Sequence, residues 1–242
     1  MEKYGLTREQ LMAVALKNQK MGTLNPYAHV RMVITKEGIY ESPDAAVNNP
    51  VAADPLHFYD MCPVSDGAAA VILCPLEKAR EFTQNVPVVI AGFGQATDTH
   101  TLQERDDPTD LKAVTLAAQQ AFSMANLKPK DVDVAELHDA FTILEIAESE
   151  HVGFFKKGEG GKAAERDETS FNGKLPINVS GGLKARGHPV GATGVAQVVE
   201  IVFQLRHDLD KDRQVKDAQV GFTVNFGGFG NNVVAFVLRR SE

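Results

Sequence analysis

The stretch Asn178-Val-Ser-Gly-Gly-Leu-Lys-Ala-Arg-Gly-His-Pro-Val-Gly-Ala-Thr-Gly194 places five glycines around a single histidine and leads directly into an apolar segment. Glycine has no Cβ, so its backbone adopts positive φ angles and approaches a ligand closely without steric cost. The stretch is therefore typical of a binding loop. A glycine-rich connection with an incidental histidine is the alternative. We take His188 as the first candidate functional residue.

The segment that follows has the spacing of a helix. Arg206 and His207 suit its C-terminal end. His188 then lies just before the helix N-terminus, where the positive end of the helix dipole disfavours an imidazolium ion. We expect a neutral His188 near pH 7, available as a general base. The side chains expected on the buried side of the helix are Val195, Val198, Val199, Ile201, Val202 and Leu205.

Composition excludes several classes of protein. The chain has 242 residues, of which 43% are hydrophobic and 24% charged, enough for one large or two small globular domains. Its net charge of -7 argues against nucleic acid as a partner. No apolar run approaches the roughly 20 residues that span a bilayer, and the charged N-terminus does not resemble a signal peptide. We therefore expect a cytoplasmic protein without a membrane partner.

The two cysteines, Cys62 and Cys74, have neither the spacing of a disulfide framework nor that of a zinc site. We expect both to be reduced thiols in the core. A metal site formed by His138, Asp139 and His188 would lack ligand spacing within one element, so we expect no metal.

The first part of the chain predicts a capped helix and then irregular structure. Thr7 and Gln10 form a capping-box pattern ahead of a helix through Lys20. The segment from Asn25 to Pro55 shows little periodicity. After it we expect a buried strand at 68–74, a short helix at 76–82 and a second buried strand at 86–93.

The remainder alternates helices with strands, which predicts an α/β fold with a mixed sheet. Asp139 is expected to cap the helix that begins near Phe141. The expected elements are a helix at 110–125, a central strand at 132–137, a helix at 141–151, a polar excursion at 158–174, and strands at 219–224 and 232–238.

Three loops are expected to share one site, because functional groups collect beyond the carboxyl ends of the strands in such a sheet. His138 follows a strand and could donate a hydrogen bond, or hold a water, at a developing negative oxygen. Asn225-Phe-Gly-Gly-Phe-Gly230 exposes backbone N–H groups suited to an oxyanion hole. His188 provides the third loop. A structural histidine and a plain hairpin turn are the alternatives for the first two.

Taken together, these motifs resemble the C-terminal part of a thiolase, in the branch of the sterol-carrier-protein thiolases and the archaeal acetoacetyl-CoA thiolases. The resemblance implies a layered αβα thiolase fold with a mixed sheet. Residues 1–66 would form the loop region, 67–85 the last strand and helix of the N-terminal domain, and 86–242 the C-terminal domain. The motifs are Ser65-Asp-Gly-Ala-Ala-Ala70, Glu136-Leu-His-Asp-Ala-Phe141, Gly158-Glu-Gly-Gly161, Pro176–Gly194 and Asn225-Phe-Gly-Gly228.

Thiolases form or cleave the bond between the α and β carbons of a 3-oxoacyl-CoA through a cysteine that becomes acylated. The resemblance implies that His188 activates this cysteine and that His138, with a water, binds the thioester oxygen. Two oxygens gain negative charge in the reaction, the thioester oxygen and the oxygen of the acyl-enzyme, and each needs preorganised hydrogen-bond donors. The donors for the oxygen of the acyl-enzyme would lie at Asn225, Gly227 and Gly228. The residues that would contact coenzyme A, a substrate and the only cofactor-like molecule expected, are Ser65, Gly182 and Lys184.

The chain departs from the family in two respects. Ala140 and Phe226 stand where many thiolases carry a second, acid/base cysteine, so His138, His188 or a water must move the α-proton. The nucleophilic cysteine belongs to an N-terminal half that the motifs do not cover. Neither cysteine here lies between a strand and a helix N-terminus, the context that lowers a thiol pKa.

We therefore expect a heteromeric, oligomeric assembly in lipid metabolism, in which another polypeptide supplies the N-terminal half. The chain would be a subunit or a truncated product, inactive when purified alone. The family also implies a small partner with a zinc ribbon and an OB-type fold. A thiolase-like aldolase subunit acting on an acyl-CoA, or a non-catalytic acyl-CoA-binding subunit, is the alternative function. No Gly-x-Ser-x-Gly turn is present, which excludes a typical serine hydrolase.

Overall fold

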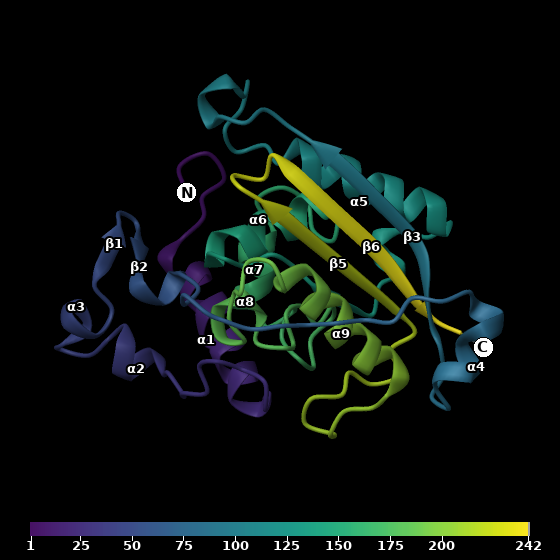
Figure 1. Ribbon diagram of the computed structural model, residues 1–242. Coiled ribbons are helices and arrows are strands. Elements are labelled where there is room, and N and C mark those ends of the chain that lie inside the picture. The colour runs from purple at the N-terminus through teal and green to yellow at the C-terminus, as the bar shows by residue number, and fades with distance from the viewer. Residues whose placement is uncertain (242) are drawn as a thin grey trace.

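The computed structural model describes residues 1–241 and contains a four-stranded mixed sheet in the order β3-β6-β5-β4 (Figure 1). Strands β5 and β6 form an antiparallel hairpin, β3 is antiparallel to β6, and β4 is parallel to β5. The mixed α/β sheet expected from the sequence is confirmed. The strands are β3 (Val88–Thr97), β4 (Val134–Glu136), β5 (Val220–Gly227) and β6 (Asn232–Arg240).

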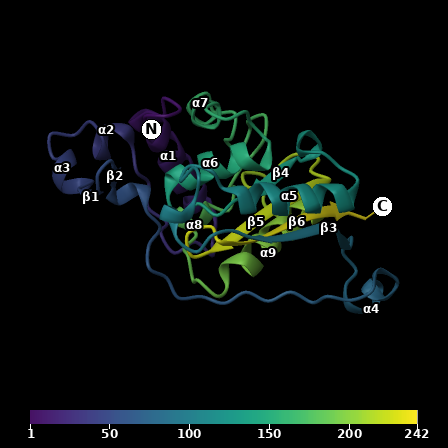
Figure 2. The same ribbon diagram turned by 90° about the horizontal axis from the view of Figure 1, so that it is seen from above.

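Two helices lie on opposite faces of this sheet, α5 (Lys112–Ala125) on one and α9 (Thr193–Arg206) on the other (Figure 2). Phe222 of β5 stacks on Phe122 of α5, with ring centroids 5.1 Å apart. The next residue toward the N-terminus, Gly221, faces Ile201 of α9, and a Cβ there would lie 2.3 Å from that side chain. Successive residues of β5 therefore pack against the helices on opposite faces of the sheet.

The helix α5 packs directly on the backbone of β3. A Cβ at Gly92 would lie 2.1 Å from the Ala121 carbonyl oxygen, and one at Gly94 would lie 2.0 Å from that of Ala117. Residues two apart in a strand lie on the same face, and so do residues four apart in a helix. The two glycines therefore face the two alanines. Only glycine permits this close approach.

The first helix, α1 (Arg8–Leu24), begins as predicted. Thr7 accepts a hydrogen bond from the Gln10 N–H, and the Gln10 side chain accepts one from the Thr7 N–H, so the capping box is confirmed. The helix packs against three others, which surround the loops of the candidate site. They are α6 (Thr142–Val152), α7 (Gly160–Glu165) and α8 (Gly182–Ala185).

The remaining elements are short. Those between residues 36 and 57 lie on one side of α1, where the sequence predicts irregular structure, and those at 76–82 form the short helix expected there. These short elements are α2 (Lys36–Ile39), α3 (Ala45–Asn48), β1 (Val51–Ala53), β2 (Leu56–His57) and α4 (Ala79–Phe82), with 3-10 turns at Phe58–Asp60, Leu76–Lys78, Leu102–Glu104 and Pro129–Asp131. Within residues 1–241 no helix combines the length and the apolar character needed to cross a membrane.

The prediction of a buried strand at residues 68–74 is wrong. This run is extended but forms no strand, and most of its side chains are exposed. It crosses the molecule over α9 as a strap between β2 and α4 (Figures 1 and 2). Cys74 is exposed and Cys62 is only partly buried, so neither is the core thiol that was expected. The apolar run of the strap is therefore no sign of a buried strand, because most of it stays exposed among the residues that the structure describes.

The predicted buried side of α9 is confirmed only in part. Ile201 and Leu205 are fully buried as expected, but Val195, Val198, Val199 and Val202 are only partly buried, whereas the polar Gln197, Glu200 and Gln204 are buried. Apolar spacing locates a helix face that avoids water, and it does not say what covers that face. Here Val198, Val199 and Val202 line an apolar groove of about 620 Å³ between α9, β3 and the strap.

Three further details differ from expectation. The strand β4 is at the edge of the sheet, yet it is buried because residues 176–178 cover it through hydrogen bonds to Ala135. The strand β3 forms, but it starts at Val88 and is half-exposed as the other edge. Asp139 does not cap α6; its carboxylate accepts from the N–H groups of Leu183 and Lys184 in α8.

Candidate active site

The structure brings the three predicted loops together around two histidines. His138 follows β4, and its ring lies 4.9 Å from that of His188, measured between centroids, at an angle of 89°. Phe226 of β5 stacks on the other side of His138 at 4.5 Å. Asn225 Nδ2 lies 2.8 Å from His138 Nδ1. One buried and one half-buried imidazole therefore meet edge to face beyond the ends of β4 and β5.

His188 is held by the first residue of α9. Its Nδ1 lies 2.7 Å from Thr193 Oγ1, and the Thr193 hydroxyl donates to the Pro189 carbonyl oxygen at 3.0 Å. A hydroxyl has a single hydrogen, so toward the ring Thr193 Oγ1 can only accept. The proton of a neutral His188 therefore lies on Nδ1, and Nε2 has the free lone pair that a general base requires.

Both histidines are neutral near pH 7. Burial, and next Arg186, hold the pKa of His188 below its ordinary value. Burial, followed by His188 and Arg186, lowers the pKa of His138 to about 3. The main cause of the low pKa of His188 is therefore burial and not the helix dipole that the sequence suggested, since α9 begins five residues after His188.

Gly227, directly after Phe226, is the last residue of β5, and Gly228 begins the turn of the β5–β6 hairpin. A Cβ at Gly227 would meet no atom within 4 Å, so its surroundings are open. Gly228 has a φ of 59°, in the left-handed region that favours glycine. Their role as oxyanion donors, together with Asn225, stays a prediction.

Of the three residues predicted to contact coenzyme A, only Ser65 lies beside His188. Its neighbour Val64 forms a β-bridge with His188, and a Cβ at Gly187 would lie 2.8 Å from Ser65 Oγ. Gly182 is buried, and a Cβ there would lie 2.2 Å from the Asp139 carboxylate.

Lys184, the third of these residues, points into the protein. Its side chain is 4% exposed, and Nζ lies 5.1 Å from the centre of the Tyr59 ring. Burial lowers the pKa of this lysine to about 8. Contact of any of the three with coenzyme A stays a prediction.

Cys62 passes close to the same loops, since its N–H donates to the Ala140 carbonyl oxygen at 2.9 Å. Burial, and next the charge of Asp139, raise the pKa of its thiol. A raised pKa favours the thiol over the thiolate, which is the reverse of what activates a nucleophile. The cysteine that is nearest in the fold is therefore poorly suited to attack a carbonyl carbon.

A buried polar network that sequence reasoning missed supports the loop at His138. Glu148 accepts from the His138 N–H at 2.7 Å. Glu136 accepts from Ser180 Oγ at 2.6 Å, and burial raises its pKa to about 7. Charged residues within apolar runs, such as Glu136 inside a strand pattern, are the sequence signal for this network, because an ionisable group is buried only when it has partners.

The same network continues into α1. Lys17 Nζ donates to Glu145 at 2.6 Å and to the Ile177 carbonyl oxygen at 2.7 Å. Asn18 donates to both Asp139 and Glu145. The N-terminal helix is therefore tied to the loop that carries His138. Within residues 1–241, no cluster of three or more His, Cys, Asp or Glu residues could hold a metal ion.

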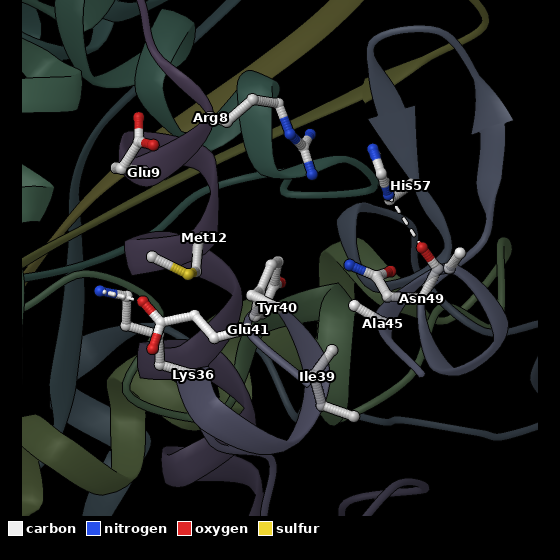
Figure 3. A pocket seen from close by; sticks show the side chains of 11 residues that line it. Arg8, Glu9, Met12, Lys36, Ile39, Tyr40, Glu41, Ala45, Asn49 and His57 are labelled. Carbon is white, nitrogen blue, oxygen red and sulfur yellow. Dashed lines mark hydrogen bonds and ion pairs between the residues drawn. The ribbon is translucent and has the colours of Figure 1, made fainter. Parts of the chain in front are cut away.

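A separate cavity of about 400 Å³ lies between α1 and the short elements at 36–57 (Figure 3). Arg8 and His57 face each other across its upper part in this view, and Lys36 pairs with Glu41 at its rim. None of the lining residues belongs to the three loops, so this cavity is distinct from the histidine site.

Comparison with known proteins gives a consistent family. A family model described as "Thiolase C-terminal domain-like" matches residues 94–240. The chain is 46% identical over 240 residues to an acetyl-CoA acetyltransferase of Methanothermobacter thermautotrophicus, covering 99% of this chain and 60% of that protein. It is 37% identical to sterol carrier protein 2 of Bos taurus, covering 97% and 42%.

Among solved structures, the "Ltp2-ChsH2(DUF35) aldolase" is similar, with a TM-score of 0.84 at 25% identity. That match covers 99% of this chain and 60% of the solved chain. The chain thus spans 42–60% of the length of these relatives.

Proposed function

The chain belongs to the thiolase family, and from this premise we propose that it supplies the general base and an oxyanion donor for a thiolase-type acyltransferase. The substrate class is a 3-oxoacyl-CoA, with coenzyme A as the second substrate. The proposal is supported by the names of the related acetyl-CoA acetyltransferases. It is carried by one observation: two neutral histidines in contact, one with a free lone pair on Nε2.

The cleavage direction shows what each group would do. His188 Nε2 takes the proton of a cysteine thiol, and the thiolate attacks the β-carbonyl carbon of the 3-oxoacyl-CoA. The bond between the α and β carbons then breaks, giving an acyl-cysteine and the enolate of acetyl-CoA. His138 stabilises the negative enolate oxygen by a hydrogen bond, which is strongest when the charge is largest. The proton on His188 is transferred to the α carbon. His188 then takes the proton of the coenzyme A thiol, the resulting thiolate attacks the acyl-cysteine to form the shortened acyl-CoA, and the cysteine thiolate leaves and is reprotonated by His188.

We propose that the nucleophilic cysteine comes from polypeptide outside these 242 residues. The raised pKa of Cys62 and the exposed position of Cys74 argue against either cysteine in this role. The apolar groove beside α9 and the exposed strap offer a surface for that polypeptide. The expected small zinc-ribbon partner is also a proposal, supported only by a similar aldolase whose name joins Ltp2 with ChsH2(DUF35).

The direct experiment compares the chain alone with the chain co-expressed with a polypeptide that carries a cysteine between a strand and a helix N-terminus. Acetoacetyl-CoA and coenzyme A are the substrates, and mass spectrometry follows acetylation of that cysteine. We expect no turnover by the chain alone, and turnover with an acetyl-cysteine intermediate in the complex. Robust turnover by the chain alone would overturn the proposal. Binding of acyl-CoA by the complex without turnover would favour a non-catalytic subunit.

An aldolase is the second candidate, favoured by the solved structure of that name and by Ala140 and Phe226 at the positions of a second cysteine. In this reaction His188 would take the proton of a β-hydroxyl group, the bond between the α and β carbons would break, and the enolate would be protonated at the α carbon. No acyl-enzyme forms. Two results together would select the aldolase: the complex cleaves a 3-hydroxyacyl-CoA without added thiol, and no acyl donor acetylates the complex.

A further inference from the structure

Gln197 is a fully buried polar side chain on α9 with every polar atom engaged. Its Nε2 lies 3.1 Å from the Val224 carbonyl oxygen and 3.5 Å from that of Glu136. Its Oε1 lies 3.1 Å from Asn225 Nδ2. Gln197 therefore touches the two strands, β4 and β5, whose ends carry the site.

The two carbonyl oxygens fix the orientation of this amide. A backbone carbonyl can only accept, so the NH₂ group of Gln197 must face Val224 and Glu136. Its oxygen is then left facing Asn225, which must present its own NH₂ group in return. Turning either amide over would place two acceptors against each other in a buried site, an arrangement that leaves both without a partner.

The second hydrogen of Asn225 Nδ2 points to His138 Nδ1, 2.8 Å away. Nδ1 must accept this hydrogen bond, so the proton of the neutral ring lies on Nε2. We infer that Gln197 is a positioning residue: acting through Asn225, it fixes His138 as the Nε2–H tautomer. Its use in catalysis rests on the proposed function, in which His138 Nε2–H donates to the enolate oxygen.

Two other features support this chain of contacts. Burial lowers the pKa of His138 to about 3, so the ring stays neutral and the tautomer alone decides which nitrogen donates. A Cβ at Gly194 would lie 3.4 Å from Asn225 Cγ, so the first turn of α9 packs closely against the Asn225 amide. The result is a pair of neighbouring histidines with opposite protonation at Nε2: His138 donates and His188 accepts.

The contact also explains why α9 buries a polar face. The same helix carries Gln204, which is equally buried and fully hydrogen-bonded to Glu200 and the 213–215 loop, away from the histidines. Gln204 therefore serves as a matched control. The two glutamines share residue type, helix and burial, and differ in whether they reach Asn225.

The experiment measures the tautomer of His138 by ¹⁵N NMR of the full, isotope-labelled chain, without substrate. The nitrogen that carries hydrogen and the one that does not resonate in separate regions, and a His138→Asn variant assigns the signal. In the wild type we expect Nε2 protonated. In Gln197→Met we expect the ratio of the Nε2–H to the Nδ1–H form to fall about tenfold, the scale of one lost hydrogen bond. Gln204→Met should leave the ratio unchanged.

Asn225→Asp provides a second variant with a different prediction. A carboxylate can only accept, so His138 must then carry a proton on Nδ1. An Nδ1–H form in the wild type, an unchanged ratio in Gln197→Met, or an equal change in Gln204→Met would each overturn the inference. The NMR experiment contains no substrate, so it tests the tautomer separately from catalysis. If the tautomer is confirmed but the assembled enzyme is inactive, the proposed function is rejected and the inference about Gln197 stands.

Discussion

Thr193 decides which nitrogen of His188 acts. Its hydroxyl gives its only hydrogen to Pro189 and so accepts from His188 Nδ1, leaving the Nε2 lone pair free.

The sequence located both histidines, because a histidine framed by glycine and proline or following an apolar strand stands out. It did not locate Thr193 or Gln197, because a threonine at a helix start and a glutamine inside a helix are common and act only through contacts made by folding.

Substituting Thr193 by valine should therefore reduce catalysis without removing the base. Valine has nearly the same shape but accepts no hydrogen bond, so Nδ1 loses its partner and the ring populates the unproductive tautomer. We expect kcat of the assembled enzyme to fall about tenfold, with KM little changed. Thr193→Ser, which keeps the hydroxyl, should restore most of the rate. Equal rates for the valine variant and the wild type would contradict this assignment.

At the scale of elements, the sequence predicts local structure well, but it does not predict which parts of the molecule cover an apolar face. The capping box at Thr7 and the two strands on either side of Gly227-Gly-Phe-Gly230 are confirmed, because their determinants lie within a few residues of each other. The buried side of α9 is right only for Ile201 and Leu205, and the buried strand at 68–74 is wrong, because apolar spacing does not reveal what covers an apolar face. Asp139 was assigned to the adjacent helix, and its partners lie in α8.

The packing of α5 on β3 gives a prediction at this scale. Gly94→Ala would place a Cβ 2.0 Å from the Ala117 carbonyl oxygen, which only a shift of the helix could relieve. We expect a loss of about 1–3 kcal/mol in the free energy of unfolding, measured by urea denaturation. Gly191→Ala is the control, since a Cβ there meets no atom within 4 Å. A Gly94→Ala variant as stable as this control would show that the close approach is not required.

At the scale of the whole molecule, one side exposes an apolar surface. Val198, Val199 and Val202 of α9 line an apolar groove, and the strap beside it exposes Ile72 and Leu73. An apolar surface of this kind marks an interaction site or a tendency to aggregate. We propose that the polypeptide that carries the cysteine binds at this groove and strap.

Ile72→Lys tests this interpretation. The side chain is 76% exposed, so the variant should match the wild type in stability to within about 0.5 kcal/mol. Burying a lysine in an apolar interface is costly, so we expect co-purification with the cysteine-bearing polypeptide to be lost. Met124→Lys on α5, at a residue 55% exposed, changes the charge equally and should leave assembly intact. Assembly of the Ile72→Lys variant at wild-type yield would place the interface elsewhere.

The most direct test of the whole account is the rate of acetoacetyl-CoA cleavage by the assembled enzyme with His188→Ala. Removing a general base should lower kcat by about 10²-fold or more. His207→Asn, at the C-terminal cap of the same helix with a φ of 61° that asparagine tolerates, should leave the rate unchanged. A loss of less than about tenfold in His188→Ala would contradict the claim that this imidazole is the base.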